Sequence, residues 1–289
     1  MEEELNCMRR LCLLVTVFLT FNNYIMAQDS VNNSIKYFLN EGYKISYRDS
    51  GYGSATIILV SGGTLGLETW KDFQELLSKY ARVISYDRSG LGNSDYVPNS
   101  KSIGYMTAEL DTVINNLDID TPVILVGHSI GGYIVRKYTE LYPNKVKALI
   151  LIDTYHELFF KELKNSVKEE MWNDYVGNII NAKDNTPVGI SDEFGFQLEL
   201  LESDEKYSVP SDIPVVLFTS IKEVPIEEKF VEFNKMAFKV HLELNNRLTE
   251  KYGNLRHIVT NKSSHFIYLD EPELIINEML KLIDNNFQK

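Results

Sequence analysis

The chain has 289 residues, which is long enough for one large single-core domain or for two small ones. Hydrophobic residues make up 44% of the sequence and charged residues 24%, as is usual for a soluble globular protein. The net charge of −12 argues against nucleic-acid binding as the main function, because such binding needs a basic surface.

Residues 1–27 are predicted to be a secretory signal peptide. Arg9 and Arg10 precede an apolar run over residues 11–21, and Ala27 suits the small-residue cleavage position. The run is too short to span a bilayer comfortably. We therefore expect a secreted or periplasmic protein with no stable membrane span after cleavage, and retention as an uncleaved anchor is the alternative.

Two antiparallel strands are predicted next, over residues 34–40 and 43–51, joined by a tight turn. Short, continuous apolar runs then alternate with amphipathic helical stretches. Such runs are typical of strands buried on both faces of a parallel sheet, and the alternation predicts an α/β doubly wound architecture. The runs cover residues 55–60, 81–87, 122–127, 147–153, 214–220 and 255–261, and the helical stretches cover 69–80, 103–117, 131–142 and 271–287.

One interval, residues 156–211, breaks this alternation. Apolar residues recur at helical spacing from Phe159 to Ile179, and a looser segment follows at 185–203. We interpret residues 156–211 as a helical cap or lid over the carboxyl edge of the sheet, where ligands bind in open α/β folds. The core would then comprise residues 34–155 and 212–289. A structural bulge is the alternative.

The sequence Gly127-His128-Ser129-Ile130-Gly131 joins a predicted buried strand to a predicted helix. A serine between two glycines in this context is a nucleophile elbow, a sharp turn that exposes the hydroxyl above the sheet. The Ile130 N–H would lie at the helix N-terminus, where partial positive charge can stabilise an oxyanion.

A serine nucleophile needs a base, and His265 is the best candidate. It follows the last predicted strand and precedes the last helix, so it should reach the same sheet edge. His128 lies inside the elbow, His241 in a helical pattern and His257 in a strand, whereas His156 begins the insertion.

The second oxyanion donor should come from the loop after the first buried parallel strand. That loop contains Gly62, Gly63 and Gly66, and glycine allows a backbone N–H to approach a substrate closely. We assign the donor to Gly63, with Thr64 as the neighbouring alternative. A glycine turn that binds no ligand is also possible.

Five motifs together resemble the α/β-hydrolase fold family over nearly all of the chain beyond the signal. They are SGGTLG, YDRSGLGNS, GHSIGG, LIDTYHE and SSHFIYLDEPE. The resemblance implies a mostly parallel sheet flanked by helices with a helical cap insertion, and a bracing role for Asp87 and Arg88. Two positions depart from the family pattern: Ser61 stands where many relatives have histidine, and Ser264 stands where glycine is common.

The resemblance leaves two candidates for the acid of a Ser-His-acid triad. Glu223 follows the seventh strand, the usual place in the family, and Asp153 follows the sixth, as in some members. Both satisfy the chain order of serine, acid and histidine. We favour Asp153, because LIDTYHE is the sharper motif. Asp153 as a structural aspartate and Glu223 as an exposed loop charge are the alternatives.

The leading hypothesis is a serine hydrolase that cleaves an ester or related acyl bond of a small molecule through an acyl-enzyme. No metal-ligand cluster or phosphate-binding loop is present, so we expect no cofactor. Aminopeptidase, carbon–carbon hydrolase, acyltransferase and cofactor-free peroxidase chemistry are alternatives, as is a non-catalytic small-ligand receptor. Some insertion aromatics should face the serine rather than form a local core: Phe159, Phe160, Trp172, Phe194 and Phe196.

Overall fold

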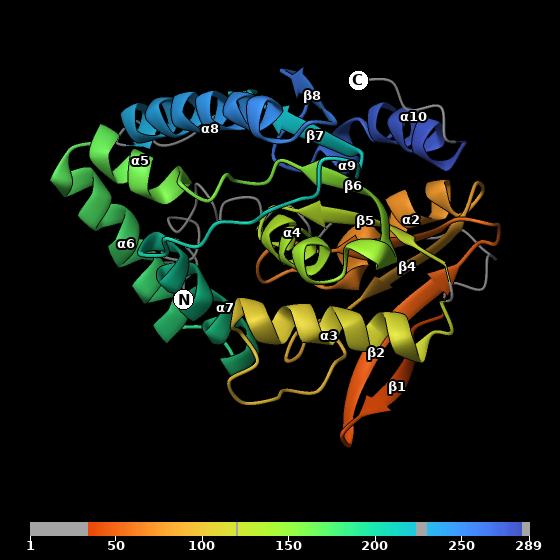
Figure 1. Cartoon of the computed structure of the whole chain (residues 1–289). Helices are drawn as coiled ribbons and strands as arrows, with labels where there is room; N and C mark the ends of the chain where they lie inside the picture. The colour runs from red at the N-terminus through yellow and green to blue at the C-terminus, as the bar shows by residue number, and fades with distance from the viewer. Residues whose placement is uncertain (1–33, 120, 224–229, 285–289) are drawn as a thin grey trace.

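The computed structural model describes residues 34–119, 121–223 and 230–284 (Figure 1). The predicted signal peptide, residues 1–27, lies outside the described residues. Among the residues that are described, no helix combines the length and apolarity needed to cross a membrane.

An eight-stranded sheet forms the centre of the molecule, in the order β1-β2-β4-β3-β5-β6-β7-β8. Strands β1 and β2 pair antiparallel, β2 also runs antiparallel to β4, and the remaining neighbours are parallel. The predicted fold class is thus confirmed. The strands are β1 Lys36–Asn40, β2 Tyr43–Ser50, β3 Thr56–Val60, β4 Arg82–Tyr86, β5 Val123–His128, β6 Val146–Ile152, β7 Val215–Ser220 and β8 Leu255–Thr260.

The central strands are buried on both faces, which explains their continuous apolar sequences. Alternate side chains of each strand enter two hydrophobic clusters on opposite faces of the sheet. Helices α3 (Ile103–Asn116), α4 (Gly131–Leu141) and α8 (Val231–Lys251) contribute to one cluster. Helices α2 (Lys71–Leu77), α9 (Ile267–Asp270) and α10 (Pro272–Ile283) contribute to the other.

Three helices occupy the interval between β6 and β7: α5 (Phe159–Ser166), α6 (Glu169–Asp184) and α7 (Val188–Leu201). Figure 1 shows them together at one end of the sheet. The segment that looked looser in the sequence is largely helix α7. Its apolar residues are spread around the helix, so no clear stripe marks it, and packing against α6 compensates for this.

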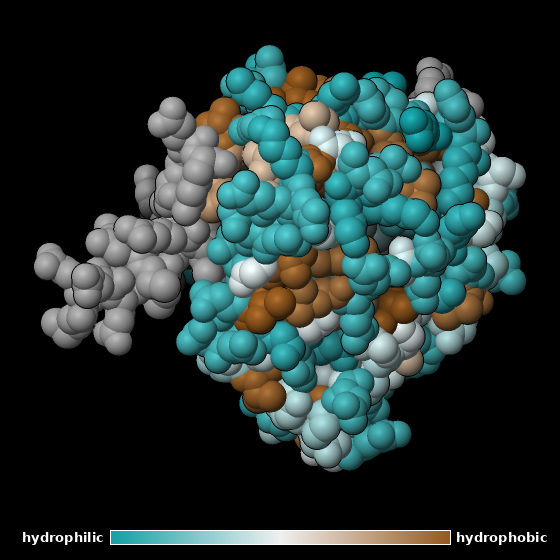
Figure 2. Space-filling model, turned by 90° about the vertical axis from the view of Figure 1, so that its left-hand side faces the viewer, coloured by the Kyte–Doolittle hydropathy of each residue, from teal (hydrophilic) through white to brown (hydrophobic). Residues whose placement is uncertain are grey.

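Figure 2 views the molecule from the side on which these helices lie. Hydrophobic surface gathers in patches there within a mainly hydrophilic surround. Ile180 on α6 and Val188 at the start of α7 are among the exposed apolar residues of the insertion. The outer surface of the insertion is therefore not uniformly polar.

Candidate active site

Ser129 occupies the sharp turn between β5 and α4. Its φ of +51° lies in the left-handed region that side chains other than glycine rarely adopt. Two hydrogen bonds join this turn to the end of β6 and the residues after it. The Ser129 N–H donates to the Ile152 carbonyl at 3.1 Å, and the Thr154 hydroxyl donates to the Ser129 carbonyl at 2.8 Å. A Cβ at Gly127 would lie 2.7 Å from the Gly131 carbonyl oxygen, so this position requires glycine.

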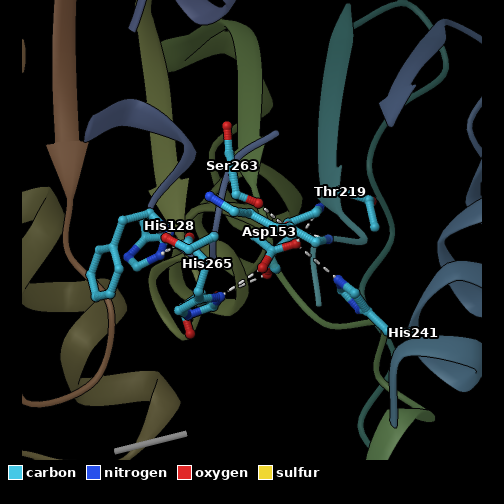
Figure 3. A network of polar contacts seen from close by, with 12 residues as sticks. His128, Asp153, Thr219, His241, Ser263 and His265 are labelled. Carbon is cyan, nitrogen blue, oxygen red and sulfur yellow. Dashed lines mark hydrogen bonds and ion pairs between the residues drawn. The ribbon is translucent and has the colours of Figure 1, made fainter. Parts of the chain in front are cut away.

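Asp153 directly follows β6 and contacts the imidazole of His265. Its Oδ2 lies 2.7 Å from Nδ1 of His265, and its Oδ1 accepts a 2.8 Å hydrogen bond from the Ser220 N–H (Figure 3). Since Nδ1 is engaged, Nε2 is the ring nitrogen that remains open to a further partner. Ser129, Asp153 and His265 line a common pocket.

The carboxyl group of Asp153 is ionised. Burial opposes ionisation, but hydrogen bonds from His241 and His265 outweigh it and hold the pKa of Asp153 well below its usual range. A permanent negative charge next to His265 can stabilise the imidazolium form of that ring.

Glu223, the other candidate acid, lies in the loop after β7 and is exposed. No hydrogen bond of its side chain is found among the described residues. At the end of β7 itself stands Ser220, whose N–H binds Asp153. The structure therefore brings Asp153, and not Glu223, to His265.

The ring of His128 packs against the ring of His265 and contacts the His265 backbone. Nε2 of His128 is 3.0 Å from the His265 carbonyl oxygen, so Nε2 carries the proton, and the two ring centres are 4.5 Å apart. Burial, and then the nearby His265, keep the pKa of His128 well below its ordinary value. His128 is thus a neutral donor that supports the loop between β8 and α9.

The two predicted oxyanion donors adjoin each other. Gly63 and Ile130 both line the pocket, and a Cβ at Gly63 would lie 2.7 Å from Cδ1 of Ile130. Within the described residues, neither N–H group has a protein acceptor. The N–H of Thr64, the alternative, donates to Glu193 at 3.3 Å, so the N–H of Gly63 is the more available of the two.

A buried ion cluster fixes this loop, and sequence reasoning missed its central residue. Arg88 donates to the carbonyls of Ser61 and Gly62 at 2.7 and 2.8 Å and forms a bidentate pair with Glu193 of helix α7. Lys101 also binds Glu193, at 2.9 Å. Glu193 lies 105 positions after Arg88, and no motif connects them.

Glu193 is charged despite its burial. Burial disfavours the carboxylate, but the charges of Arg88 and Lys101 overcome this and lower the pKa of Glu193 to about 2. The insertion is therefore tied to the loop that carries Gly63 by an ion cluster in which one carboxylate pairs with two cations.

Aromatic side chains dominate the pocket wall. All five insertion aromatics belong to one hydrophobic cluster. Phe159, Phe160 and Phe194 also line the pocket, as the sequence predicts for some of them, whereas Trp172 and Phe196 do not. Other aromatic lining residues are Tyr133, Tyr155, Tyr175, Phe233, Phe238 and Phe266. Across the described residues, no group of three or more histidine, cysteine or carboxylate side chains is arranged to hold a metal ion.

The elbow serine and His265 line one pocket, over a mostly parallel sheet with helices on both faces. The family model for the alpha/beta hydrolase fold matches residues 55–211. The chain belongs to the α/β-hydrolase fold family.

Curated relatives match only part of the chain. A 2-hydroxy-6-oxononadienedioate/2-hydroxy-6-oxononatrienedioate hydrolase of Escherichia coli (strain K12) is 34% identical over 114 residues. That match covers 38% of this chain and 39% of the relative. The chain thus spans about two fifths of the length of the curated relatives it matches.

Solved structures share the fold over most of the chain. A variant of an epoxide hydrolase from Bacillus megaterium is 17% identical with a TM-score of 0.64, covering 86% of this chain and 100% of that chain. An esterase from Exiguobacterium antarcticum is 18% identical with a TM-score of 0.60, covering 84% and 97%.

Proposed function

We propose that this protein cleaves an ester or related acyl bond of a small molecule through a covalent acyl-enzyme on Ser129. The observation that supports this best is the 2.7 Å hydrogen bond between Asp153 and His265 in the pocket that the elbow serine lines. A carboxylate, an imidazole and a hydroxyl in this order form the machinery of serine esterases.

In the proposed reaction, the Ser129 hydroxyl attacks the substrate carbonyl while Nε2 of His265 takes its proton. Asp153 stabilises the resulting imidazolium, and the N–H groups of Gly63 and Ile130 bind the oxyanion. The tetrahedral intermediate then collapses, and His265 returns the proton to the leaving alcohol. Water, activated by His265, hydrolyses the acyl-enzyme and restores Ser129.

The pocket wall favours an apolar acyl group. Its lining is mainly aromatic, and apolar walls with a few polar groups suit hydrophobic ligands. Lys222 is the cation among the described lining residues. Arg88 and Lys101 are not among the lining residues, and both pair with the carboxylate of Glu193.

A second candidate is hydrolysis of a dicarboxylate such as the dienedioate in the names of the curated relatives. Two substrate carboxylates would need cationic partners, and Lys222 offers one. The scarcity of free cations in the described lining favours the ester over the dicarboxylate.

We also propose that residues 1–27 direct export, with cleavage near Ala27, so that the enzyme acts in the periplasm or outside the cell. The order of charged, apolar and small residues supports this. Determining the N-terminal residue of the exported protein tests it, and an N-terminus at Met1 or Met8 in the exported fraction would contradict cleavage.

Covalent labelling tests the chemistry directly. A fluorophosphonate should modify Ser129, and Ser129→Ala should abolish both labelling and turnover of p-nitrophenyl esters while leaving the melting temperature nearly unchanged. Ser264→Ala is the matched control, since Ser264 also lines the pocket, and it should retain full labelling. Labelling at another serine would overturn the assignment.

A substrate panel separates the two candidates. Short and medium p-nitrophenyl esters should be cleaved more efficiently than an amino-acid p-nitroanilide or a 2-hydroxy-6-oxo-dienedioate. A kcat/KM that is highest for the dienedioate would replace the ester proposal with the second candidate.

A further inference from the structure

The carboxylate of Asp153 binds two histidines at once. His265 contacts Oδ2, and Nε2 of His241 lies 3.1 Å from Oδ1 (Figure 3). His241 comes from helix α8 and is 3% exposed. Its ring packs edge-on against Tyr155 and Phe159 of the pocket wall, with ring centres 4.9 and 5.9 Å apart.

The neighbours of His241 determine which of its nitrogens carries a proton. Nε2 faces a carboxylate, which can only accept, so Nε2 donates. The amide nitrogen of Asn245 lies 3.5 Å from Nδ1 and 3.4 Å from Nε2. Both amide hydrogens have closer acceptors elsewhere, so this amide lies against the ring while Asp153 alone identifies Nε2 as a donor.

The orientation of the Asn245 amide is itself fixed. Its nitrogen lies 3.3 Å from the Thr154 carbonyl oxygen, which accepts only from a donor, and 2.9 Å from the Thr219 hydroxyl oxygen. The Thr219 hydroxyl lies 2.8 Å from Nε2 of His257, whose Nδ1 is 3.0 Å from the side-chain oxygen of Asn246. Nδ1 of His257 therefore donates, and its Nε2 accepts from Thr219.

These contacts form a directional chain from Asn245 through Thr219 and His257 to Asn246. Burial, and then the nearby His241, lower the pKa of His257 to about 4, so its ring is neutral near pH 7 and can accept from Thr219. The two amide hydrogens of Asn245 are taken by Thr154 and Thr219, and these bonds hold the amide beside the ring of His241.

We propose that His241 is a positioning residue that fixes the Asp153 carboxylate for His265. As a donor through Nε2, it holds Oδ1 together with the Ser220 N–H, so Oδ2 is left facing Nδ1 of His265. This inference rests on the proposed function, in which His265 is the general base. With one donor lost, the carboxylate can rotate and the imidazole loses its alignment to Ser129.

The test compares three variants. His241→Leu removes the donor and should lower kcat about 100-fold, the usual effect of a misplacement of about 1 Å, while KM changes less than about twofold. His241→Gln restores an N–H near the position of Nε2 and should recover kcat to within about fivefold. His156→Leu replaces another buried histidine that does not contact Asp153, and it should keep kcat within about threefold.

Two further measurements keep this inference separate from the proposed function. Melting temperatures and fluorophosphonate labelling of His241→Leu should show a folded protein that still reacts, more slowly, at Ser129. Nitrogen-15 histidine spectra of the wild type should show the proton of His241 on Nε2. If the wild type is active and His241→Leu is equally active, or if the ring of His241 carries its proton on Nδ1 alone, the role of His241 is overturned. An unlabelled, inactive wild type would instead overturn the proposed function.

Discussion

Nδ1 of His265 lies 2.7 Å from Oδ2 of Asp153, a residue 112 positions earlier in the chain. Asp153 directly follows β6, and β6 pairs in parallel with β5, the strand that leads into Ser129. Ser129 and the carboxylate therefore come from neighbouring strand ends, and the Ser129 N–H bonds directly to the last residue of β6. A shift of either strand would disturb both groups together.

The first prediction concerns the acid. Asp153→Asn should lower kcat by about 10⁴ with little change in KM, because an amide can favour the wrong imidazole tautomer and cannot stabilise the imidazolium. Glu223→Gln is the matched control and should stay near the wild type, since Glu223 is exposed. Steady-state kinetics with a p-nitrophenyl ester measures both. A crippled Glu223→Gln beside an active Asp153→Asn would reverse the assignment.

The second prediction concerns substrate selection by helix α7. Phe194 and Phe196 both pack in the hydrophobic cluster, but of the two only Phe194 also lines the pocket. Phe194→Ala should shift the preferred acyl chain length, because it enlarges the pocket. Phe196→Ala should lower the free energy of unfolding by about 3–5 kcal/mol without altering that preference. If both variants shifted the chain-length preference equally, Phe194 would not be the residue of the two that selects the acyl chain.

The third prediction concerns the ion cluster that joins the insertion to the loop of Gly63. Glu193→Gln leaves Arg88 and Lys101 buried without their anion and should cost about 3–5 kcal/mol of unfolding free energy. Kcat should also fall, because Thr64 loses a charged acceptor beside the oxyanion loop. Urea denaturation and ester kinetics measure the two effects.

Glu202→Gln is the control for that cluster. Glu202 pairs with Lys164 on the surface, so its loss should cost no more than about 1 kcal/mol. The effect of Glu193 should also depend on pH. Its pKa of about 2 lies below the ordinary 4.5, so its stabilisation is present above about pH 4.5 and is lost as the pH falls toward 2. A deficit in Glu193→Gln that stayed constant down to pH 2.5 would contradict this account.

The fourth prediction concerns Glu109 on α3. Burial outweighs the attraction of Lys101 and the Ser89 N–H, and raises the pKa of Glu109 to about 7. An acid whose folded pKa is raised contributes stability that is fully present below about pH 4.5 and is lost as the pH rises through 7. Glu109→Gln should therefore gain stability relative to the wild type between pH 4.5 and 7. Urea midpoints at several pH values test this, with exposed Glu232→Gln as the control, and a difference independent of pH would refute it.

Patterns within short segments predicted much of this molecule. Continuous apolar runs identified β3 to β8, since a strand covered by helices on both faces needs apolar residues throughout. The motif around Ser129 identified the elbow because its glycines are needed where Gly127 meets Gly131 and Gly131 meets Val60.

Contacts between distant segments could not be predicted in the same way. His241 appeared only as part of a helical pattern, and its contact with Asp153 depends on how α8 crosses the end of β6. Glu193 lay in a segment that seemed loose, and its two cationic partners come from loops far earlier in the chain. The choice between Asp153 and Glu223 likewise depends on loop geometry, which no spacing in the sequence encodes.

Ser129 and Asp153 both have a positive φ, which lowers the stability of the fold at the two positions that the proposed activity requires. With φ of +51° and +46°, each costs about 1–3 kcal/mol that glycine would not incur. A directed-evolution experiment that selected only for heat resistance should therefore enrich glycine at these two positions and yield sturdier but inactive proteins. Natural selection for a working enzyme would oppose that drift in every generation.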